Sequence, residues 1–179
     1  MKAAPLPQNE DERLAELLSY DVLDTEAEQL FDDLTALASQ ICETPIALIS
    51  LIDPNRQWFK SRVGLDAEET SRDIAFCSHA ILQSDVFEIP NATLDPRFHD
   101  NPLVTGAPDI RFYAGAPLIT PSGHAIGTLC AIDSKPRKLT ETQKASLQTL
   151  SKSVVAHLEL KRKNRELERT SQFKSDFLT

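Results

Sequence analysis

The chain has 179 residues, of which 41% are hydrophobic, so it can fill one sizeable core and is not a disordered or fibrous protein. Its formal net charge of −8 would repel a phosphate backbone, which argues against nucleic acid as a partner. The sequence has no apolar run near the roughly 18 to 20 residues of a membrane span and no signal-peptide region at its start, so we expect a cytoplasmic protein.

Two amphipathic helices are predicted before the first strand. The first begins near Asn9, because Asn9 and Glu12 have the spacing of a capping box and leucines follow at helical spacing. Thr25 and Glu28 repeat that spacing ahead of a second helix, whose apolar residues continue to Ile41. We expect the second helix to lie against a sheet.

Strands and a short helix are expected in the middle of the chain. Residues 45–52 are apolar at both alternating positions, which indicates a central strand covered on both faces, and residues 57–63 can pair back onto it. Apolar residues at helical spacing predict one helix over residues 72–83, and a short strand follows at residues 87–89. Frequent prolines keep regular structure brief between residues 91 and 109.

The last part of the chain predicts a hairpin and a long helix. Residues 110–119 and 124–132 have strand patterns and are joined by a turn sequence of the hairpin type. Thr140 and Gln143 form a third capping pattern, and neither proline nor glycine interrupts the chain after them. The order of elements predicts an α+β fold: a central antiparallel sheet of five to six strands, flanked by helices, with a long C-terminal signalling helix.

Five segments carry a family resemblance: LDTEAEQLFDDLTALASQIC, ALISLIDPNRQWFKSRVGL, AFCSHAI, NATLDPRFHDNPLV and IRFYAGAPLITPSGHAIGTLCAID. In this order they resemble a GAF domain of the bacterial signalling type, from about Leu23 to Ser153. The resemblance implies terminal helices on one face of the sheet and a small-molecule pocket on the other, roofed by segments between residues 70 and 109. The chain then divides into a tail and helix (1–22), a GAF sensor domain (23–153) and a coiled-coil-like connector helix (154–179).

The end of the chain carries a second resemblance. FKSDFLT, with matching residues 173–178, is similar to the opening of the dimerisation and phosphoacceptor helix of sensor histidine kinases. It implies the sensor region of a two-component system, with an ATP-dependent kinase domain downstream in the same chain. These 179 residues have no glycine-rich phosphate loop and stop before a phosphoacceptor, so we expect no catalytic residue and no enzymatic activity in them.

Three other roles remain open for the chain. It could be the regulatory GAF domain of a diguanylate cyclase, although such a junction usually looks different from FKSDFLT. It could be a cofactor-binding or redox protein that uses Cys77. It could also be a dimerisation scaffold without a pocket.

Six residues are candidates for contact with a small-molecule ligand whose identity the sequence does not give. Arg111 and Tyr113 begin the strand that would line the pocket, where a cation and an aromatic ring could orient an anionic or planar ligand. Arg111 could equally pair with Asp109. The roof segments contribute the other four candidates, Phe76, Cys77, His79 and Phe98.

The cysteines and histidines suggest neither a metal site nor a disulfide framework. Cys42, Cys77 and Cys130 are far apart and odd in number, and no CxxC pair occurs, so we expect reduced thiols. The histidines lack the spacing of metal ligands.

Cys77 lies close to His79 in the sequence, a pairing that can activate a nucleophile or anchor a cofactor. Cys77 also shares a predicted helix face with Ile74 and Ile81, which favours core packing. Some GAF domains attach a bilin to a cysteine that is followed directly by a histidine. Here Ser78 separates Cys77 from His79, which disfavours a bilin, and we expect no covalently bound cofactor.

The terminal helix has a mixed heptad seam. Its predicted contact positions are Leu150, His157, Leu160, Asn164 and Leu167. A seam that combines leucines with polar residues predicts a homodimer of marginal stability, and a marginal coiled coil suits a two-state relay. The competing interpretation is a solvated helix face.

Overall fold

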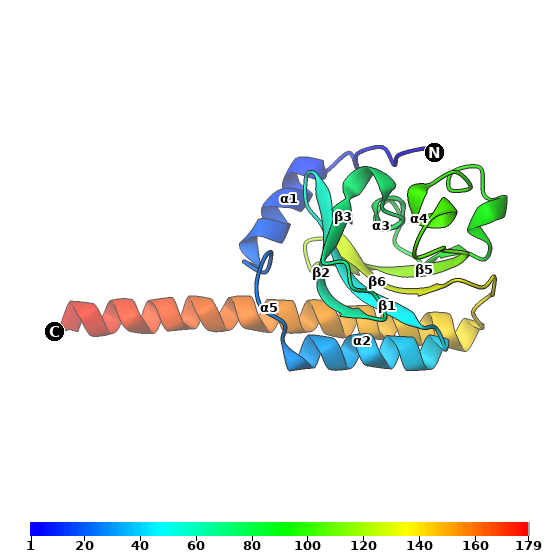
Figure 1. Cartoon of the computed structure of the whole chain (residues 1–179). Coiled ribbons are helices and arrows are strands. Elements are labelled where there is room, and N and C mark those ends of the chain that lie inside the picture. Colours follow the sequence, from blue (N-terminus) through cyan, green and yellow to red (C-terminus); the bar gives the residue numbers. More distant parts are fainter. Residues whose placement is uncertain (179) are drawn as a thin grey trace.

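A computed structural model describes residues 1–178 of the chain. Its centre is a six-stranded sheet with the order β3-β2-β1-β6-β5-β4, in which every adjacent pair is antiparallel. The predicted α+β fold with a central antiparallel sheet is confirmed (Figure 1). The strands are β1 (Ile46–Ile52), β2 (Arg56–Val63), β3 (Glu69–Ser71), β4 (Phe87–Ile89), β5 (Phe112–Ile119) and β6 (Ala125–Asp133).

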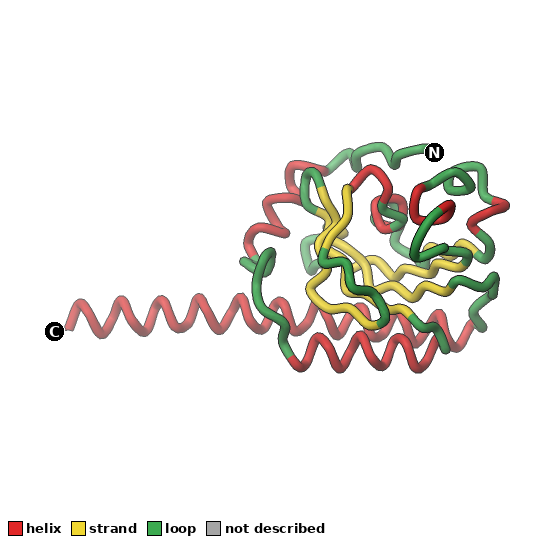
Figure 2. Tube along the Cα trace, in the orientation of Figure 1, coloured by secondary structure: helices red, strands yellow, loops and turns green. Residues whose placement is uncertain are grey.

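Helices cover both faces of this sheet, but they differ in length (Figure 2). One face packs against the long helices α2 (Gln29–Cys42) and α5 (Glu141–Leu178), and α1 (Glu10–Ser19) adds Leu17 to the same core. The other face carries only short elements, which are η1 (Arg72–Ile74), α3 (Cys77–Ala80), η2 (Ala92–Leu94) and α4 (Pro102–Thr105). Long helices form a continuous layer, whereas short ones leave room for a cavity.

Strand β1 divides the two cores. Ala47, Ile49 and Leu51 pack on the side of α2 and α5, and Leu48 and Ile52 pack on the other side. The apolar pattern of residues 45–52 therefore predicted a central strand buried on both faces correctly.

A β-bulge interrupts the pairing of β1 with β2. Ile49 lies opposite Ser61 and Ser50 lies opposite Phe59, so Lys60 has no partner across the ladder. Phe59 then packs on the face of the short helices, while Lys60 approaches the ring of Phe31 in α2. Ordinary strand alternation separates Phe59 from Lys60. The bulge leaves the next residue, Ser61, on the same side as Lys60, where its hydroxyl donates to Asp32 of α2.

Glycine is required where β6 crosses β1. A Cβ atom at Gly127 would lie 1.9 Å from the carbonyl oxygen of Ser50, far inside van der Waals contact. The close approach holds Thr128 opposite Ser50. The same pairing places Cys130 near the middle of the sheet.

Two of the three predicted capping boxes are wrong. Neither Asn9 nor Glu28, which are the N-caps of α1 and α2, makes a side-chain capping hydrogen bond. Thr25 instead donates its hydroxyl to the carbonyl of Val22. The third box forms, because Thr140 Oγ1 accepts from the Gln143 amide at 3.1 Å and Gln143 Oε1 accepts from the Thr140 amide at 2.9 Å.

The single helix predicted over residues 72–83 is also wrong. The structure has the short η1 and α3 there, separated by the extended residue Ala75. Ser71 accepts a hydrogen bond from the Asp73 amide and Ser78 donates to the carbonyl of Arg72, so side chains satisfy the groups that a continuous helix would pair.

Helix α5 contains 38 residues and would be about 57 Å long at about 1.5 Å per residue. Its first half packs on the sheet and on α2, and its second half extends beyond the domain (Figure 1). Within residues 1–178, no helix combines the length and the apolar composition needed to cross a bilayer.

Candidate functional site

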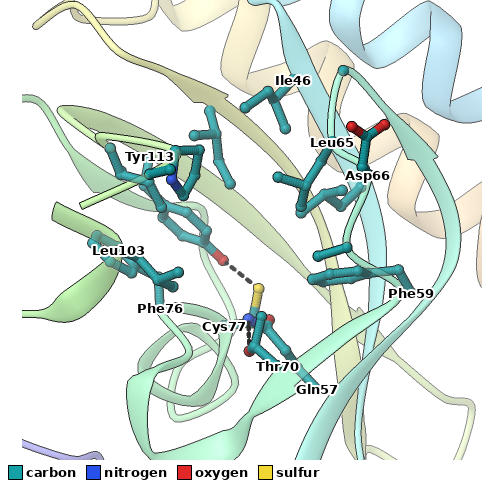
Figure 3. A pocket seen from close by; sticks show the side chains of 17 residues that line it. Ile46, Gln57, Phe59, Leu65, Asp66, Thr70, Phe76, Cys77, Leu103 and Tyr113 are labelled. Carbon is teal, nitrogen blue, oxygen red and sulfur yellow. Dashed lines mark hydrogen bonds between the residues drawn. The ribbon is translucent and has the colours of Figure 1, made fainter.

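A cavity of about 370 Å³ lies between the sheet and the short elements on its open face (Figure 3). This volume falls within the range of small-molecule sites, about 300 to 1,000 Å³. The sheet contributes Ile46, Leu48, Gln57, Phe59, Tyr113 and Ile132. Thr70 of the edge strand β3 also lines it, and the wall is completed by residues 64–67, Phe76, Cys77, Leu103, Ala107, Pro108 and Ile110.

The rim of the cavity begins at Gly64. Its φ of 75° lies in the left-handed region, and a Cβ atom there would lie 2.1 Å from the Pro45 carbonyl oxygen. This turn directs Leu65 and Asp66 toward the cavity. Of the described residues that line the cavity, Asp66 alone carries a charged side chain.

The polar floor of the cavity centres on Cys77. The hydroxyls of Tyr113 and Thr128 each donate a hydrogen bond to Cys77 Sγ at 3.1 Å, and Cys130 Sγ lies 4.0 Å from the same sulfur. Figure 3 shows the Tyr113 hydroxyl pointing at the Cys77 sulfur across the cavity. All four residues are buried.

These contacts separate the acidities of the two thiols. Burial raises the pKa of Cys77, but the hydrogen bonds from Cys130, Thr128 and Tyr113 outweigh it and bring that pKa to about 7. The hydrogen bond with Cys77 and burial raise the pKa of Cys130 well above its ordinary value. Burial likewise raises the pKa of Tyr113. Of the two thiols, Cys77 is therefore the one that loses its proton first.

A second polar chain lies beside this floor. Ser50 Oγ donates to Gln57 Oε1 at 3.0 Å, and Gln57 Nε2 donates to Thr70 Oγ1 at 2.7 Å. The Gln57 amide thus has a fixed orientation at the cavity wall. A ligand with one hydrogen-bonding end would meet the Gln57 amide and the Cys77 cluster on otherwise apolar walls.

The structure brings three of the six predicted ligand residues together. Phe76, Cys77 and Tyr113 line the cavity. Phe98 stacks behind Phe76, with ring centroids 4.1 Å apart. These placements are geometric, and the predicted ligand contacts themselves stay predictions.

The two basic candidates, His79 and Arg111, have their polar groups engaged elsewhere. His79 Nε2 lies 3.1 Å from the Lys2 carbonyl oxygen, and burial lowers the pKa of His79. Arg111 Nη1 donates to the carbonyls of Val104 and Ile110 at 2.9 and 3.0 Å, and Arg111 does not line the cavity. The cation that was predicted to orient an anionic ligand is therefore engaged with backbone carbonyls instead.

Sequence reasoning missed several residues of the site. The period-2 rule places Gln57 and Phe59 on one face of β2, so alternation could have identified both. Cys130 and Cys77 are 53 residues apart, and no local pattern joins them.

The predicted seam of α5 separates into a packed part and an exposed part. Leu150 packs against the main core, and the His157 ring meets the Phe31 ring edge-on with centroids 4.8 Å apart. Leu160, Asn164 and Leu167 are exposed. Only these last three residues are free to form a seam with another helix.

An acidic residue links the sheet to α5 where the helix leaves the domain. Glu28 Oε2 pairs with Lys60 Nζ at 2.7 Å, and Glu28 Oε1 pairs with Lys161 of α5. The Lys60 side chain is only 1% exposed, so its charge depends on protein partners. Glu28 therefore joins β2, α2 and α5 at one point.

A second contact anchors the same turn of α5. The Arg162 guanidinium lies 4.4 Å from the Tyr20 ring centroid and donates to Ser19 Oγ at 2.6 Å. Arg162 also pairs with Glu159 at 2.7 Å. The base of the projecting helix is thus fixed to α1 as well as to α2.

Comparison with known proteins identifies the family to which this sequence is similar. The sequence matches the profile of the GAF domain family over residues 26–158. It is 46% identical over 159 residues to a cyclic di-GMP phosphodiesterase of Pseudomonas aeruginosa, an alignment that covers 88% of this chain and 27% of that protein. The chain therefore spans about a quarter of the length of this relative.

Solved structures of low identity have the same fold. The free methionine-R-sulfoxide reductase of Neisseria meningitidis aligns with a TM-score of 0.62 and 16% identity, over 92% of this chain and 99% of that one. The GAF domain of an Acinetobacter phosphoenolpyruvate-protein phosphotransferase aligns with a TM-score of 0.60 and 15% identity, over 83% and 91%. At these identities the likeness concerns the fold alone.

Proposed function

Because the chain belongs to the GAF domain family, we propose that it is a regulatory domain that senses a small molecule and passes the signal through α5 to an output domain. The observation that carries this proposal is the cavity on the open face of the sheet, opposite the layer that contains α5. The cavity has apolar walls and a few fixed polar groups, which is the usual composition of a small-molecule site.

The lining favours a neutral or cationic ligand with an apolar, planar body. The rings of Phe59, Phe76 and Tyr113 offer flat surfaces, and the Gln57 amide offers one polar end. A phosphate would find no lysine, arginine or histidine among the described lining residues, and it would face Asp66 at the rim. A nucleotide used by an output domain would therefore bind outside this cavity.

We infer a route from the cavity to α5 through the bulge in β2. Phe59 lines the cavity, and the next residue, Lys60, shares Glu28 with Lys161 of α5. A ligand that displaces Phe59 would also displace Lys60 and change the ion pairs at the base of α5. The signal would then be a change in the direction or register of that helix.

The exposed half of α5 supplies the means to reach an output domain. We propose that two copies pair along Leu160, Asn164 and Leu167, which lie on one side of the helix. A polar residue between two leucines keeps such a pair weak. A weak pair responds to a small energetic change at its base.

We propose cyclic di-GMP turnover as the first candidate output, because a curated relative with 46% identity over 159 residues is a cyclic di-GMP phosphodiesterase. A histidine kinase is the second candidate, on the observation that residues 173–178 resemble the start of a kinase dimerisation helix. Both outputs use nucleotides of the cytoplasm, so we propose a cytoplasmic location. Incubation of the full-length protein with cyclic di-GMP or with ATP would separate hydrolysis from autophosphorylation.

A thermal-shift screen tests the sensing proposal. Neutral planar compounds should raise the Tm, whereas nucleotides and other phosphates should not. A ligand at about 100 times its Kd stabilises a protein by about 2.7 kcal/mol, which corresponds to a Tm shift of roughly 5 to 10 °C for a chain of this size.

The control for this screen uses two matched variants. Ala67→Trp places a large ring on the exposed rim of the cavity and should abolish the shift. Ala145→Trp makes the same change at an exposed position of α5 and should preserve it. Equal shifts in both variants would place the binding site elsewhere and contradict the proposal.

A further inference from the structure

Two cysteine thiols meet beneath the cavity, although the sensing function does not require either of them. Cys77 belongs to α3 and lines the cavity, and Cys130 lies behind it in β6. Their sulfur atoms are 4.0 Å apart. The two thiols are therefore in contact, and only the first borders the space that a small molecule can enter.

The surroundings of Cys77 stabilise a thiolate. The Tyr113 and Thr128 hydroxyls donate to its sulfur at 3.1 Å, and the Cys130 thiol adds a third hydrogen-bond partner. These groups hold the pKa of Cys77 at about 7 against the opposing effect of burial. The thiolate is the reactive form of cysteine, so Cys77 is a nucleophile at neutral pH.

We propose that Cys77 and Cys130 form a peroxide-responsive thiol pair, in which a hydroperoxide that enters the cavity oxidises Cys77 and Cys130 then closes a disulfide with it. This function goes beyond ligand sensing and does not depend on which output domain follows.

The two steps balance as an ordinary thiol oxidation. The Cys77 thiolate attacks the terminal oxygen of the peroxide, the O–O bond breaks, and the leaving oxygen takes a proton to depart as water or an alcohol. Cys77 is then a sulfenic acid. The Cys130 sulfur attacks the Cys77 sulfur, the S–O bond breaks, and the hydroxide leaves as water with the proton of the Cys130 thiol. Two electrons pass from the thiol pair to the peroxide.

Disulfide formation would move α3. A disulfide bond is about 2.05 Å long, so the two sulfur atoms must approach by about 2 Å from their present 4.0 Å. Cys130 is held in the middle of the sheet between β1 and β5, whereas α3 has only four residues. We expect α3 to move toward the sheet, which changes the cavity wall next to Phe76.

Cys42 provides an internal control. It is buried in the core between α2 and the sheet, away from the cavity. Burial raises the pKa of Cys42 to about 11. It should therefore react with peroxide much more slowly than Cys77 does.

The test is to treat the purified chain with hydrogen peroxide, block free thiols in denaturant and measure the intact mass and the peptide map. In the wild-type chain and in Cys42→Ser, Cys77 and Cys130 should together lose two hydrogens and escape blocking. The digest should contain a Cys77–Cys130 linked peptide, and dithiothreitol should break this link. Cys130→Ala should stop at the sulfenic acid and bind dimedone at Cys77. Cys77→Ala should show neither product.

Circular dichroism shows whether each variant folds. If a variant of Cys77 or Cys130 does not fold, the wild type and Cys42→Ser are sufficient to test the proposal. Oxidation of Cys42 at the same rate as Cys77, or a wild-type chain without the linked peptide, would overturn the proposal. Trapping of the sulfenic acid in the wild type, with no disulfide, would also overturn the resolving role of Cys130.

Discussion

The surroundings of the Cys77 thiol shift its pKa in opposite directions. Burial favours the neutral thiol, while the donors that converge on the sulfur favour the thiolate and prevail. The neighbouring Cys130 is affected in the opposite sense, because it donates to the charge that Cys77 carries. One geometric cluster thus yields one reactive thiol and one protonated thiol.

Thr128→Val tests this account of Cys77. Valine has nearly the same shape as threonine but cannot donate to the sulfur, so the pKa of Cys77 should rise from about 7 toward its ordinary value. Alkylation follows the thiolate, so the rate at Cys77 rises as pH increases through its pKa, and the midpoint of the variant should lie at higher pH. At pH 7, an increase of one unit from a pKa of about 7 lowers the thiolate fraction about fivefold, and the labelling rate should fall with it.

The measurement is the pH profile of iodoacetamide labelling, quantified peptide by peptide. Cys42, read in the same digest, should label equally slowly in both proteins. Coincident midpoints for Cys77 in wild type and variant would mean that the Thr128 hydroxyl does not stabilise the thiolate.

Among the elements, β2 and α5 are joined by ion pairs through Glu28. Burial raises the pKa of Glu28, but the hydrogen bonds from Lys161 and Lys60 outweigh it, so the pKa lies below its usual value. A carboxyl group with a lowered folded-state pKa stabilises the fold above its unfolded pKa. That contribution is lost as pH falls through the folded-state pKa.

Glu28→Gln should therefore loosen the base of α5. It removes the carboxylate from the buried Lys60 ammonium and from Lys161, and should lower the free energy of unfolding by about 1 to 3 kcal/mol at neutral pH. Hydrogen exchange should accelerate at residues 156–166. The stability difference from wild type should shrink on acidification, as Glu28 of the wild type becomes protonated.

Glu69→Gln is the matched control for this change. It removes a carboxylate from the Arg56 guanidinium, but the Glu69 side chain is 52% exposed and Arg56 retains Asp24 and Asp53. The cost should stay below about 1 kcal/mol. If Glu28→Gln leaves the hydrogen exchange of α5 unchanged, the proposed route from the cavity to α5 through Glu28 loses its support.

Some helices and strands were predictable from sequence patterns and others were not. Residues 45–52 and the hairpin at 110–132 were predictable, because apolar alternation and turn chemistry act within a few residues. The helix over 72–83 was not, because Cys77 and Ile81 reach the core from the short α3 as well as they would from one long helix. Two side-chain hydrogen bonds decide between these possibilities: Ser71 accepts from the Asp73 amide, and Ser78 donates to the Arg72 carbonyl.

For the whole molecule, the candidate site depends on topology. Antiparallel pairing of β1 with β6 and of β6 with β5 gathers Ser50, Thr128, Cys130 and Tyr113 from distant parts of the sequence. The resemblance to a GAF domain predicted which face carries the pocket. It did not predict that Arg111 would face backbone carbonyls or that Cys130 would contact Cys77.

The exposed half of α5 gives the molecule its means of assembly. Leu160 and Leu167 are 54% and 67% exposed, and Asn164 lies between them on the same side of the helix. Their burial against a second copy removes apolar surface from water, while an asparagine at a core position of a coiled coil weakens it. We therefore predict a weak dimer whose average mass in sedimentation rises with protein concentration.

Variants of the seam should shift this equilibrium in opposite directions. Leu160→Glu with Leu167→Glu should keep the chain monomeric, because like charges would face each other across the seam. Asn164→Leu should tighten the dimer by about tenfold or more, since about 1.4 kcal/mol changes an association constant tenfold. Arg169→Gln changes the net charge as much as one Leu→Glu substitution, but lies on the opposite side of α5 and should leave the mass profile unchanged. If the double glutamate variant associates as the wild type does, the seam lies elsewhere, and a relay through paired α5 helices loses its physical basis.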